Sequence, residues 1–364
     1  MGTSPVISDR QLNRATLARQ LLLERTAMPV VKAIEQVLAL QAQVPRPPHV
    51  GLWSRLPAFE REHLHVPLRS RALVRATTMR GTLHIMSAKD FLAFRGALQE
   101  SLTAGVRPVV GNAPLPPVDV LVAAARKILA REPLTFNEIR AALVKQFPKS
   151  HDRLMGYTVR MHLPLVQVPT EDDVWGFPSD SAFAPADAWI KKPVGQGDGP
   201  AKLVLRYLAA FGPASSADIQ AWTGLRGVAE IVKPLRSKLV TFTDARGREL
   251  FDLPKAPRPD ADTDAPVRFL PEYDSVVIGH ADRSRLVDEK YRKALVTKNL
   301  IVPPTFLVDG RIAGTWKIER KKAAATLQLA PFAPLTKSVR RELEREGEAL
   351  AHFVEPDAKE FVVR

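Results

Sequence analysis

The order of predicted elements repeats along this chain, and the repeat is what most limits its fold. Residues 118–162 contain three stretches with helical periodicity, and two short strands around an acidic turn follow, the second at residues 174–177. Residues 201–253 again contain three helices and a hairpin. In each copy the second helix begins with a capping box, formed by Thr135 with Glu138 and by Ser215 with Asp218. Two tandem copies of one supersecondary unit are not expected by chance.

Three helices followed by a hairpin is the order of a winged helix, a unit that presents one helix to the major groove of DNA. The first part of the chain fits the same plan less cleanly, with helices at residues 10–25 and 28–41 and strand-like runs at residues 71–79 and 81–86. The predicted fold class is therefore mainly α with β wings. It consists of tandem winged-helix (helix-turn-helix) units plus a small β-rich C-terminal domain.

Linker-like segments rich in Pro, Gly and Asp divide the chain, at residues 108–118, 191–200 and 254–266. The predicted domains are a winged-helix-like unit at residues 1–112, a second winged helix at 113–190, a third at 191–255 and the β-rich domain at 256–364. In the last domain, residues 268–280 and 304–320 alternate as strands do, and Asp309-Gly310 is a strong hairpin signal. A closing amphipathic helix is expected at residues 335–354.

The charge balance favours a polyanionic partner. The chain has 53 Lys and Arg against 39 Asp and Glu, a net charge of +14, and a basic excess binds phosphate backbones by releasing counterions. There is no cysteine and no metal-ligand spacing among the histidines, so neither a metal nor another cofactor is expected. No apolar run is long enough to cross a membrane. We expect a cytoplasmic, nucleoid-associated protein.

A pair of glutamines, Gln41 and Gln43, stands just before a proline-rich segment in LALQAQVPRPP. The apolar face of the preceding helix, continued by one turn, carries Gln41 inward, and an unsatisfied buried amide costs about 1–3 kcal/mol. On a helix the two side chains point about 200° apart, whereas on an extended segment they share one face. We therefore predict that the helix ends near residues 40–42. The alternative is a polar helix C-terminus that caps backbone carbonyls.

The candidate DNA contacts are Arg80, Thr82, His84, Arg283 and Lys317. Arg80 precedes a glycine that lets the backbone approach a phosphate closely, although a surface salt bridge is an equal alternative. His84 lies in a predicted strand, where a lone histidine is more often a hydrogen-bonded core residue. Arg283 belongs to the basic run at residues 281–287, and Lys317 follows Trp316, for which simple packing is favoured.

Four further residues have two interpretations each. His49 and Trp53 either border a lesion pocket or support the loop. Glu272 and Asp274 either help to position a water molecule or only orient arginines.

Five motifs, in this order, resemble the winged-helix DNA-binding superfamily that includes the AlkZ-like DNA glycosylases: LNRATLARQLLLER (12–25), LQAQVPRPP (40–48), MRGTLHIM (79–86), LPEYDSVVIG (270–279) and VDGRIAGTW (308–316). The resemblance implies tandem winged helices that form a curved DNA-binding surface, with a β-rich C-terminal piece. It also implies that Gln41 and Gln43 are catalytic. The related YcaQ-like branch carries aspartate at the second position, so Gln43 places this chain with the AlkZ-like branch.

Glycosylases of this type excise alkylated bases and unhook interstrand crosslinks. The implied partner is double-stranded DNA with alkylated or crosslinked purines, and the reaction hydrolyses the N-glycosidic bond of an N7-alkylated purine nucleotide. A glutamine carbonyl can position water while its NH2 group is anchored elsewhere, but an amide cannot act as a general base. LQAQVPRPP contains no lysine that could attack the sugar, so a monofunctional enzyme is expected. Whether the base is flipped out stays open.

Two other classes of function remain. A non-catalytic winged-helix DNA-binding protein, such as a transcription regulator, fits the repeats and the charge equally well. A scaffold for protein contacts is less compatible with a net charge of +14. Nothing in the sequence demands a partner subunit, and we expect a monomer.

Overall fold

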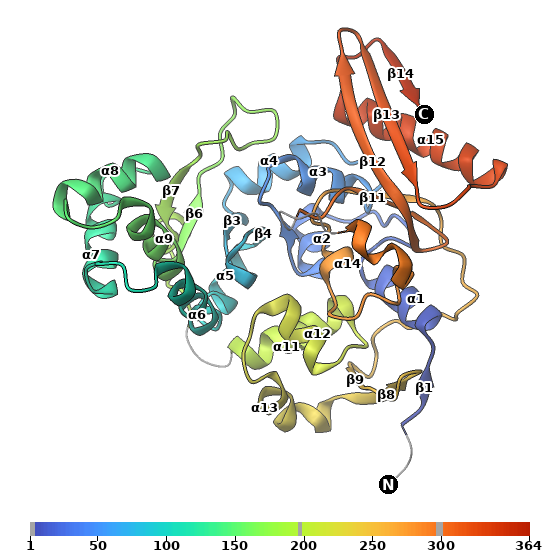
Figure 1. Cartoon of the computed structure of the whole chain (residues 1–364), viewed down its shortest axis with the longest axis horizontal. Helices are drawn as coiled ribbons and strands as arrows, with labels where there is room; N and C mark the ends of the chain where they lie inside the picture. Colours follow the sequence, from blue (N-terminus) through green and yellow to red (C-terminus); the bar gives the residue numbers. More distant parts are fainter. Residues whose placement is uncertain (1–3, 196–198, 296–300) are drawn as a thin grey trace.

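The structure is a computed structural model that describes residues 4–195, 199–295 and 301–364. Part of the predicted linker at residues 191–200 therefore lies outside the described residues. Figure 1 shows three lobes around a central sheet: helices α7 to α9 at one end, the sheet β10 to β14 with α15 at the other, and α11 to α13 with β8 and β9 below. None of the described helices is long and apolar enough to cross a membrane.

The central sheet contains strands from the first two predicted domains. Its order is β2 (Leu40–Gln41), β4 (Leu83–Ser87), β3 (Leu73–Thr77), β6 (Leu165–Gln167), β7 (Ala182–Pro185) and β5 (Leu134–Thr135). The link between the two halves is the antiparallel pair β3–β6, in which Arg75 lies opposite Gln167. Backbone hydrogen bonds of one sheet thus cross the predicted boundary at residues 112 and 113.

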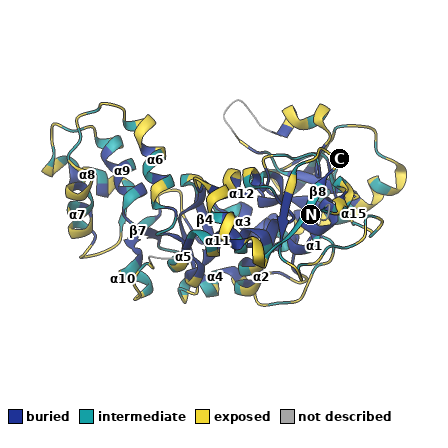
Figure 2. Cartoon of the chain, turned by 90° about the horizontal axis from the view of Figure 1, so that it is seen from below, coloured by how far each residue is buried: buried dark blue, intermediate teal, exposed yellow. Residues whose placement is uncertain are grey.

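The helices of the first part pack around this sheet, except α1, which packs against α11 (Gly199–Phe211) of the third part. They are α1 (Asp9–Arg19), α2 (Val30–Val37), α3 (Arg46–Trp53), α4 (Glu62–Arg69), α5 (Ala88–Phe94) and α6 (Gln99–Val110). The apolar face of α2 includes Ile34 and Val37 and packs against Leu64 of α4 and Ile85 of β4. Seen from below, buried residues follow the central sheet, whereas α7 and α8 carry exposed faces (Figure 2).

The prediction that this helix ends at residues 40–42 was wrong by one turn. Helix α2 ends at Val37, and Leu38 takes a positive φ of 75°. The chain can then pair with β4 through Leu40 and Gln41. Sheet pairing at the edge of β4 has overridden the helical periodicity of the sequence.

The second part contains α7 (Val118–Ile128), α8 (Phe136–Gln146) and α9 (Asp152–His162), followed by β6, β7 and the short α10 (Ala186–Ile190). The capping box of Thr135 with Glu138 is confirmed.

The strand predicted at residues 174–177 was wrong, because β7 begins only at Ala182. The intervening residues form a loop closed by a 2.9 Å hydrogen bond from the Thr170 N–H to the Gly176 carbonyl. Trp175 lies 4.1 Å beneath the Arg61 guanidinium. The Trp175 ring therefore makes a tertiary contact and does not belong to a strand of alternating side chains.

The third part contains α11 (Gly199–Phe211), α12 (Ser216–Thr223) and α13 (Val228–Val232), with the hairpin β8 (Val240–Asp244) and β9 (Glu249–Asp252). The Ser215 and Asp218 capping box is confirmed. The N-terminal strand β1 (Val6–Ile7) pairs in parallel with β8. The hairpin therefore belongs to a three-stranded sheet completed from the start of the chain.

The fourth part is a five-stranded sheet made of β10 (Arg268–Leu270), β11 (Thr305–Val308), β12 (Arg311–Lys321), β13 (Ala324–Pro331) and β14 (Glu360–Val363), with the closing helix α15 (Lys337–Val354). The hairpin turn at Asp309-Gly310 is confirmed.

Residues 268–280 are strand only at their start, so that prediction was partly wrong. The strand ends at Leu270, and a short helix, α14 (Ser275–Ile278), follows. Asp274 caps α14 by accepting a 3.0 Å hydrogen bond from the Val276 N–H. The capping interaction favours a helical turn over an extended strand at this point.

Candidate functional site

The glutamine pair lies at the edge of the central sheet. Gln41 pairs with His84 in the β2–β4 ladder, and the Ala42 N–H donates to the Leu83 carbonyl at 2.7 Å. Extended pairing covers Leu40 to Ala42, and the chain bends at Gln43. A helix C-terminus at the pair, the alternative considered from the sequence, is wrong.

Both carboxamides are anchored through their carbonyl oxygens. Gln41 Oε1 accepts a 3.0 Å hydrogen bond from Arg80 Nη2, and Gln43 Oε1 accepts a 3.4 Å hydrogen bond from the Leu83 N–H. Since both partners can only donate, the oxygen of each amide must face inward. The Nε2 groups make no hydrogen bond within the described part of the chain. The expected arrangement, with the NH2 group anchored, is thus reversed, and NH2 donors and the second carbonyl lone pair remain available.

Gln41 and Gln43 differ in burial. Gln41 is 9% exposed, whereas Gln43 is exposed. Gln41 is the more tightly fixed of the two, because its partner Arg80 is itself bound to the carbonyl of Trp222 at the end of α12. A contact between the first and third parts therefore sets the orientation of Gln41.

Arg80 lies in the tight turn η1 (Met79–Gly81) between β3 and β4, with φ of 56°. Gly81 follows at φ of 72°, a conformation that glycine adopts without steric cost. The Arg80 side chain is exposed, yet protein surrounds its guanidinium closely enough for desolvation to lower its pKa to about 10. A cavity of about 200 Å³ adjoins Arg80 and Gly81, between η1, α6 and α9.

Two more arginines hold the same region. Arg75 on β3 donates to the Ala42 carbonyl at 2.9 Å and to the Gln43 carbonyl at 3.4 Å. Arg160 on α9 donates to the Gly81 carbonyl at 3.3 Å. Burial, followed by the positive charge of Arg160, lowers the pKa of Arg75 to about 10. In the part of the chain that the structure describes, none of the three arginines forms an ion pair with a carboxylate.

His84 lies beneath this turn and is fully buried. Its Nδ1 lies 3.1 Å from both the Thr78 hydroxyl and the Thr82 carbonyl. Burial, with a smaller contribution from the charge of Arg80, lowers the pKa of His84 to about 3, so the ring is neutral at pH 7. The expectation that His84 contacts DNA is corrected: no part of the ring reaches the surface, and the core interpretation fits. Thr82 is partly exposed and donates its hydroxyl to the Met79 carbonyl at 3.2 Å.

The remaining basic candidates occupy two other hollows. Lys317 lies along a hollow of about 390 Å³ together with Arg46, which follows Gln43 by three residues in the sequence. The Lys317 ammonium pairs with Glu319 at 2.7 Å. Arg283 lines a hollow of about 580 Å³ together with Lys290, Arg292 and Lys293 of the turn η3 (Glu289–Leu295).

Comparisons with known proteins decide the family. A family model described as DNA glycosylase AlkZ-like matches residues 34–353. The chain belongs to the AlkZ-like DNA glycosylase family. A curated relative from Streptomyces sahachiroi, named interstrand DNA cross-link repair glycosylase, is 26% identical over 365 residues, which cover 94% of this chain and 95% of the relative. The solved structure of Streptomyces sahachiroi DNA glycosylase AlkZ has the same fold, with a TM-score of 0.80 at 20% identity over 98% of this chain and 99% of that one.

The acidic candidates of this AlkZ-like chain are bound to arginines. Asp274 forms a two-point ion pair with Arg55 at 2.9 Å, and the side chains are 1% and 0% exposed. Glu272 pairs with Arg46 at 2.7 Å. The interpretation that these carboxylates orient arginines therefore fits.

The aromatic candidates support the AlkZ-like core. His49 is buried 3.0 Å from His65, and its pKa is lowered to about 3 by burial. Trp53 packs under the Arg25 guanidinium at 4.6 Å. Trp316 is 3% exposed and donates to the Leu270 carbonyl at 3.0 Å, so simple packing is confirmed.

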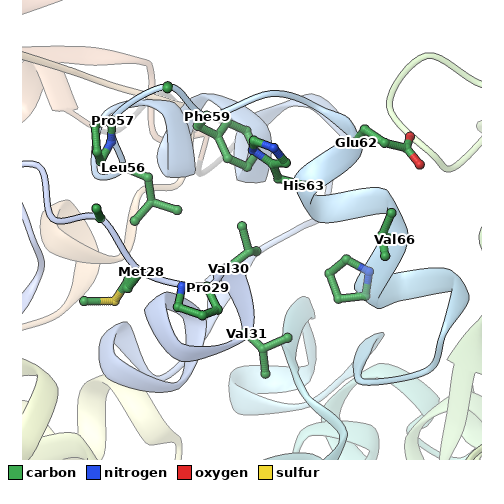
Figure 3. A pocket seen from close by; sticks show the side chains of 13 residues that line it. Met28, Pro29, Val30, Val31, Leu56, Pro57, Phe59, Glu62, His63 and Val66 are labelled. Carbon is green, nitrogen blue, oxygen red and sulfur yellow. The ribbon is translucent and has the colours of Figure 1, made fainter.

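A large apolar cavity lies away from the glutamine pair. Its volume is about 610 Å³, and it is lined by residues at the start of α2 and around α4, among them Met28, Val31, Phe59, His63 and Val66 (Figure 3). The glutamine pair follows the opposite end of α2. Hydrocarbon walls do not match a polyanionic ligand, and this cavity plays no part in the candidate site.

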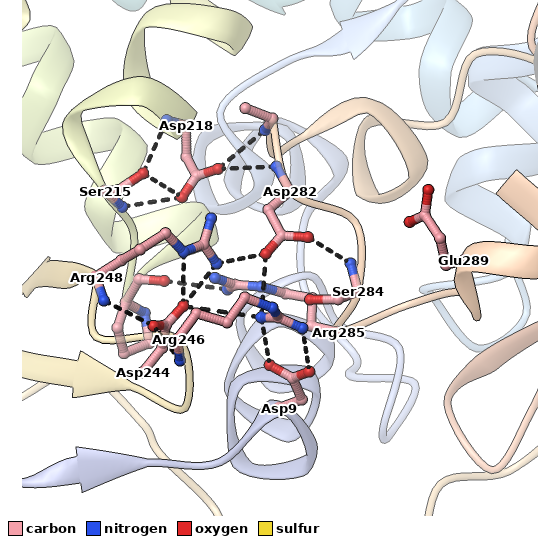
Figure 4. Close-up of polar contacts among 12 residues, drawn as sticks. Asp9, Ser215, Asp218, Asp244, Arg246, Arg248, Asp282, Ser284, Arg285 and Glu289 are labelled. Carbon is pink, nitrogen blue, oxygen red and sulfur yellow. Dashed lines mark hydrogen bonds and ion pairs between the residues drawn. The ribbon is translucent and has the colours of Figure 1, made fainter.

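A polar network fixes α12, the helix that carries the Trp222 carbonyl. Asp218 in its first turn accepts hydrogen bonds from the Ser215 hydroxyl at 2.7 Å and from the Ala281 N–H at 2.9 Å. Asp244, Arg246, Arg248 and Asp282 continue the network to Asp9 of α1 (Figure 4). The segment that carries Arg283 and the helix that orients Arg80 thus belong to one hydrogen-bonded unit.

Sequence analysis missed Arg75, Arg160 and Trp222. Arg75 lies in the arginine-rich run at residues 69–81, which was a usable signal. The other two come from distant helices, and nothing in the local sequence marks them. Across the described ranges, no three His, Asp or Glu side chains converge as metal ligands do.

Proposed function

We propose that this protein hydrolyses the N-glycosidic bond of N7-alkylated purine nucleotides in DNA, including interstrand crosslinks, with Gln41 and Gln43 positioning the water. One observation carries the proposal. The two amides are fixed through their carbonyls at the edge of the central sheet, beside arginines that have no carboxylate partner in the described structure. The name of the Streptomyces sahachiroi relative, an interstrand cross-link repair glycosylase, supports the crosslink substrate.

The neutral character of the site suits an already activated leaving group. Alkylation at N7 makes guanine cationic, so the base departs neutral and needs no proton from the enzyme. His84 is neutral and buried, and Asp274 is bound to Arg55. The remaining task is to hold a water against the anomeric carbon while the sugar becomes oxocarbenium-like. Amides can do this, and their modest power would spare normal nucleotides.

We propose that the water binds at Gln41 Oε1. Arg80 occupies one lone pair of Gln41 Oε1, and the second can accept a hydrogen bond from the water. The free Nε2 groups of Gln41 and Gln43 can donate to oxygens of the sugar or a phosphate. Since LQAQVPRPP contains no lysine, hydrolysis leaves an abasic site without a lyase step.

The DNA surface is proposed to be built from tandem winged helices, divided as the sequence suggests, in a monomer. The element order α7, β5, α8, α9, β6, β7 supports this for the second part, since β5 pairs with β7. Helices α9 and α13 are then the third helices of two units, the position that reads the major groove. Arg80, Thr82, Arg283 and Lys317 are the proposed contacts to the backbone.

The test is excision of N7-methylguanine from duplex DNA, with alkali to reveal abasic sites, using the parent and Gln41→Ala and Gln43→Ala variants. We expect each variant to lose roughly 100-fold or more in single-turnover rate while it keeps its affinity for DNA. Gln146→Ala, at an exposed position on α8, is the matched control. A crosslinked duplex is tested in parallel.

Two outcomes would contradict the proposal. DNA binding by the parent without any excision would indicate a binding protein such as a regulator. Borohydride trapping of a covalent protein–DNA adduct would contradict the monofunctional reaction.

A further inference from the structure

Arg160 reaches the candidate site from a helix that the sequence assigns to another unit. It lies in the last turn of α9, and its guanidinium contacts the Gly81 carbonyl of the turn that carries Arg80. The charge of Arg160 also acts on Arg75, whose guanidinium holds the backbone after Gln41. Helix α9 therefore places a positive charge at the turn that orients the glutamine pair.

The hydrogen-bonding capacity of Arg160 is largely unused. A guanidinium has five N–H donors, and within the described residues Arg160 makes one long side-chain hydrogen bond, at 3.3 Å. Its Nε is buried without a partner. Arg160 as a residue is partly exposed, and burial of its guanidinium lowers its pKa.

A nearby arginine shows what a purely structural role looks like. Arg95, on the loop after α5, is 1% exposed and donates to Gln99 at 2.9 Å and to the Met161 carbonyl at 2.8 Å. These are short bonds to fixed acceptors in the core. Arg160 has neither the burial nor the short bonds of Arg95, although the two lie around the same end of α9.

We propose that Arg160, at the turn that carries Arg80, binds one backbone phosphodiester of DNA close to the lesion. The inference rests on the proposed action on DNA and adds a site to it. A phosphodiester carries one negative charge and two free oxygens, which suits a guanidinium group that lacks a carboxylate in the described structure. The neighbouring Gln41, Gln43 and His84 are uncharged, so they supply no competing anion.

The site has a consequence for catalysis. Arg160 donates to the carbonyl of Gly81, which follows Arg80, and Arg80 donates to Gln41 Oε1, so a phosphate bound by Arg160 would hold the turn that fixes Gln41. Binding of the DNA backbone would then help to set the water-positioning amide. Arg160 is a positioning and binding residue in this scheme and does not touch the reacting atoms.

A phosphate-neutralisation scan tests the site. Duplexes that carry one uncharged methylphosphonate linkage, moved stepwise along both strands around an N7-methylguanine, are titrated with the parent and with Arg160→Gln. We expect the parent to lose roughly tenfold in affinity at the contacted linkage. The Arg160→Gln variant should bind unmodified DNA more weakly than the parent does. Neutralising the contacted linkage should reduce the affinity of this variant little further, because the arginine and that phosphate are coupled partners.

Two control variants test whether the effect depends on the position of Arg160 and on its positive charge. Arg131→Gln removes the same charge from an exposed site in the loop between α7 and α8, and it should keep the full sensitivity of the parent. Arg160→Lys keeps the charge and should recover part of the sensitivity. Melting curves of all variants identify any loss of folding.

The outcomes are separable from those for the proposed function. If Arg160→Gln remains as sensitive as the parent at every linkage, the phosphate site is overturned, whether or not the parent excises the base. If the parent fails to excise but the coupling at one linkage is present, the phosphate site stands and the proposed reaction falls.

Discussion

Arginines in two regions of this molecule have opposite surroundings. In the network of Figure 4, Arg246 and Arg248 meet Asp9, Asp244 and Asp282 at several points. At the turn beside the glutamine pair, Arg75, Arg80 and Arg160 donate only to carbonyl and amide oxygens within the described chain. The arginines of the first set are paired with carboxylates, and those of the second set are not.

The arginines that are paired with carboxylates stabilise the fold, whereas the arginines at the glutamine turn are suited to binding an anionic ligand. Charges that are matched inside the protein contribute to stability and gain nothing from an outside anion. A desolvated arginine without a counter-ion depends on neutral oxygens, as Arg95 does in the core. An arginine of this kind that remains accessible gains from an outside anion that supplies the missing charge. The comparison supports the glutamine turn, and not the network, as the place where DNA binds.

Removal of a buried carboxylate that is paired with arginines should have the largest effect on stability. The Asp244 side chain is buried and accepts hydrogen bonds from the N–H groups of Arg246 and Arg248 at 2.9 Å and from Arg248 Nε at 2.7 Å. Asp244→Ala should lower the free energy of unfolding by about 3 kcal/mol, measured by urea denaturation. Asp260→Ala, at an exposed aspartate, should change it by less than about 0.5 kcal/mol. Equal effects would remove the distinction between the two regions.

The unmatched arginine that orients Gln41 should affect rate more than stability. Arg80→Gln removes the guanidinium that holds Gln41 Oε1, and a misplaced catalytic group costs roughly 100-fold in rate. Single-turnover excision should fall by about that factor while the melting temperature stays near that of the parent. A variant that loses stability but keeps its rate would show that Arg80 belongs with the matched arginines.

Buried histidines in both regions should make the fold sensitive to mild acid. Burial lowers the pKa of His84 at the glutamine turn, and of His280 beside the network, from 6.5 to about 3. Below pH 6.5 the unfolded chain therefore binds protons that the folded chain refuses, and stability falls with pH by up to about 1.4 kcal/mol per unit for each histidine. Denaturation midpoints at pH 7.5, 6.5 and 5.5 measure the slope. His84→Gln should flatten it, whereas a change at exposed His151 should not.

The smallest effect is expected where a matched pair is exposed. Arg236 and Glu249 form a two-point ion pair, but their side chains are 52% and 46% exposed. Glu249→Gln should change the free energy of unfolding by less than about 1 kcal/mol, and added salt should reduce the difference further. If Glu249→Gln lowered the free energy of unfolding as much as Asp244→Ala does, pairing with an opposite charge, and not burial, would determine the stability of the network.

Local signals in the sequence predicted many of the elements. The capping boxes at Thr135 and Ser215 and the Asp309-Gly310 turn formed as predicted, because each depends on residues within a few positions of one another. The end of α2 and the position of β7 were misjudged. Sheet pairing in the first case, and a loop closed on itself in the second, outweighed periodicity.

The sequence by itself determined the basic charge, the glutamine pair and the motifs that mark the AlkZ-like family. Only the tertiary structure decided which way the amides face, because Arg80 and the Leu83 N–H can donate but not accept. It also decided which arginines lack a carboxylate partner among the described residues. Arg160 lies far along the chain from Arg75 and Arg80, and whether a charge is matched depends on distances in space that no local pattern records.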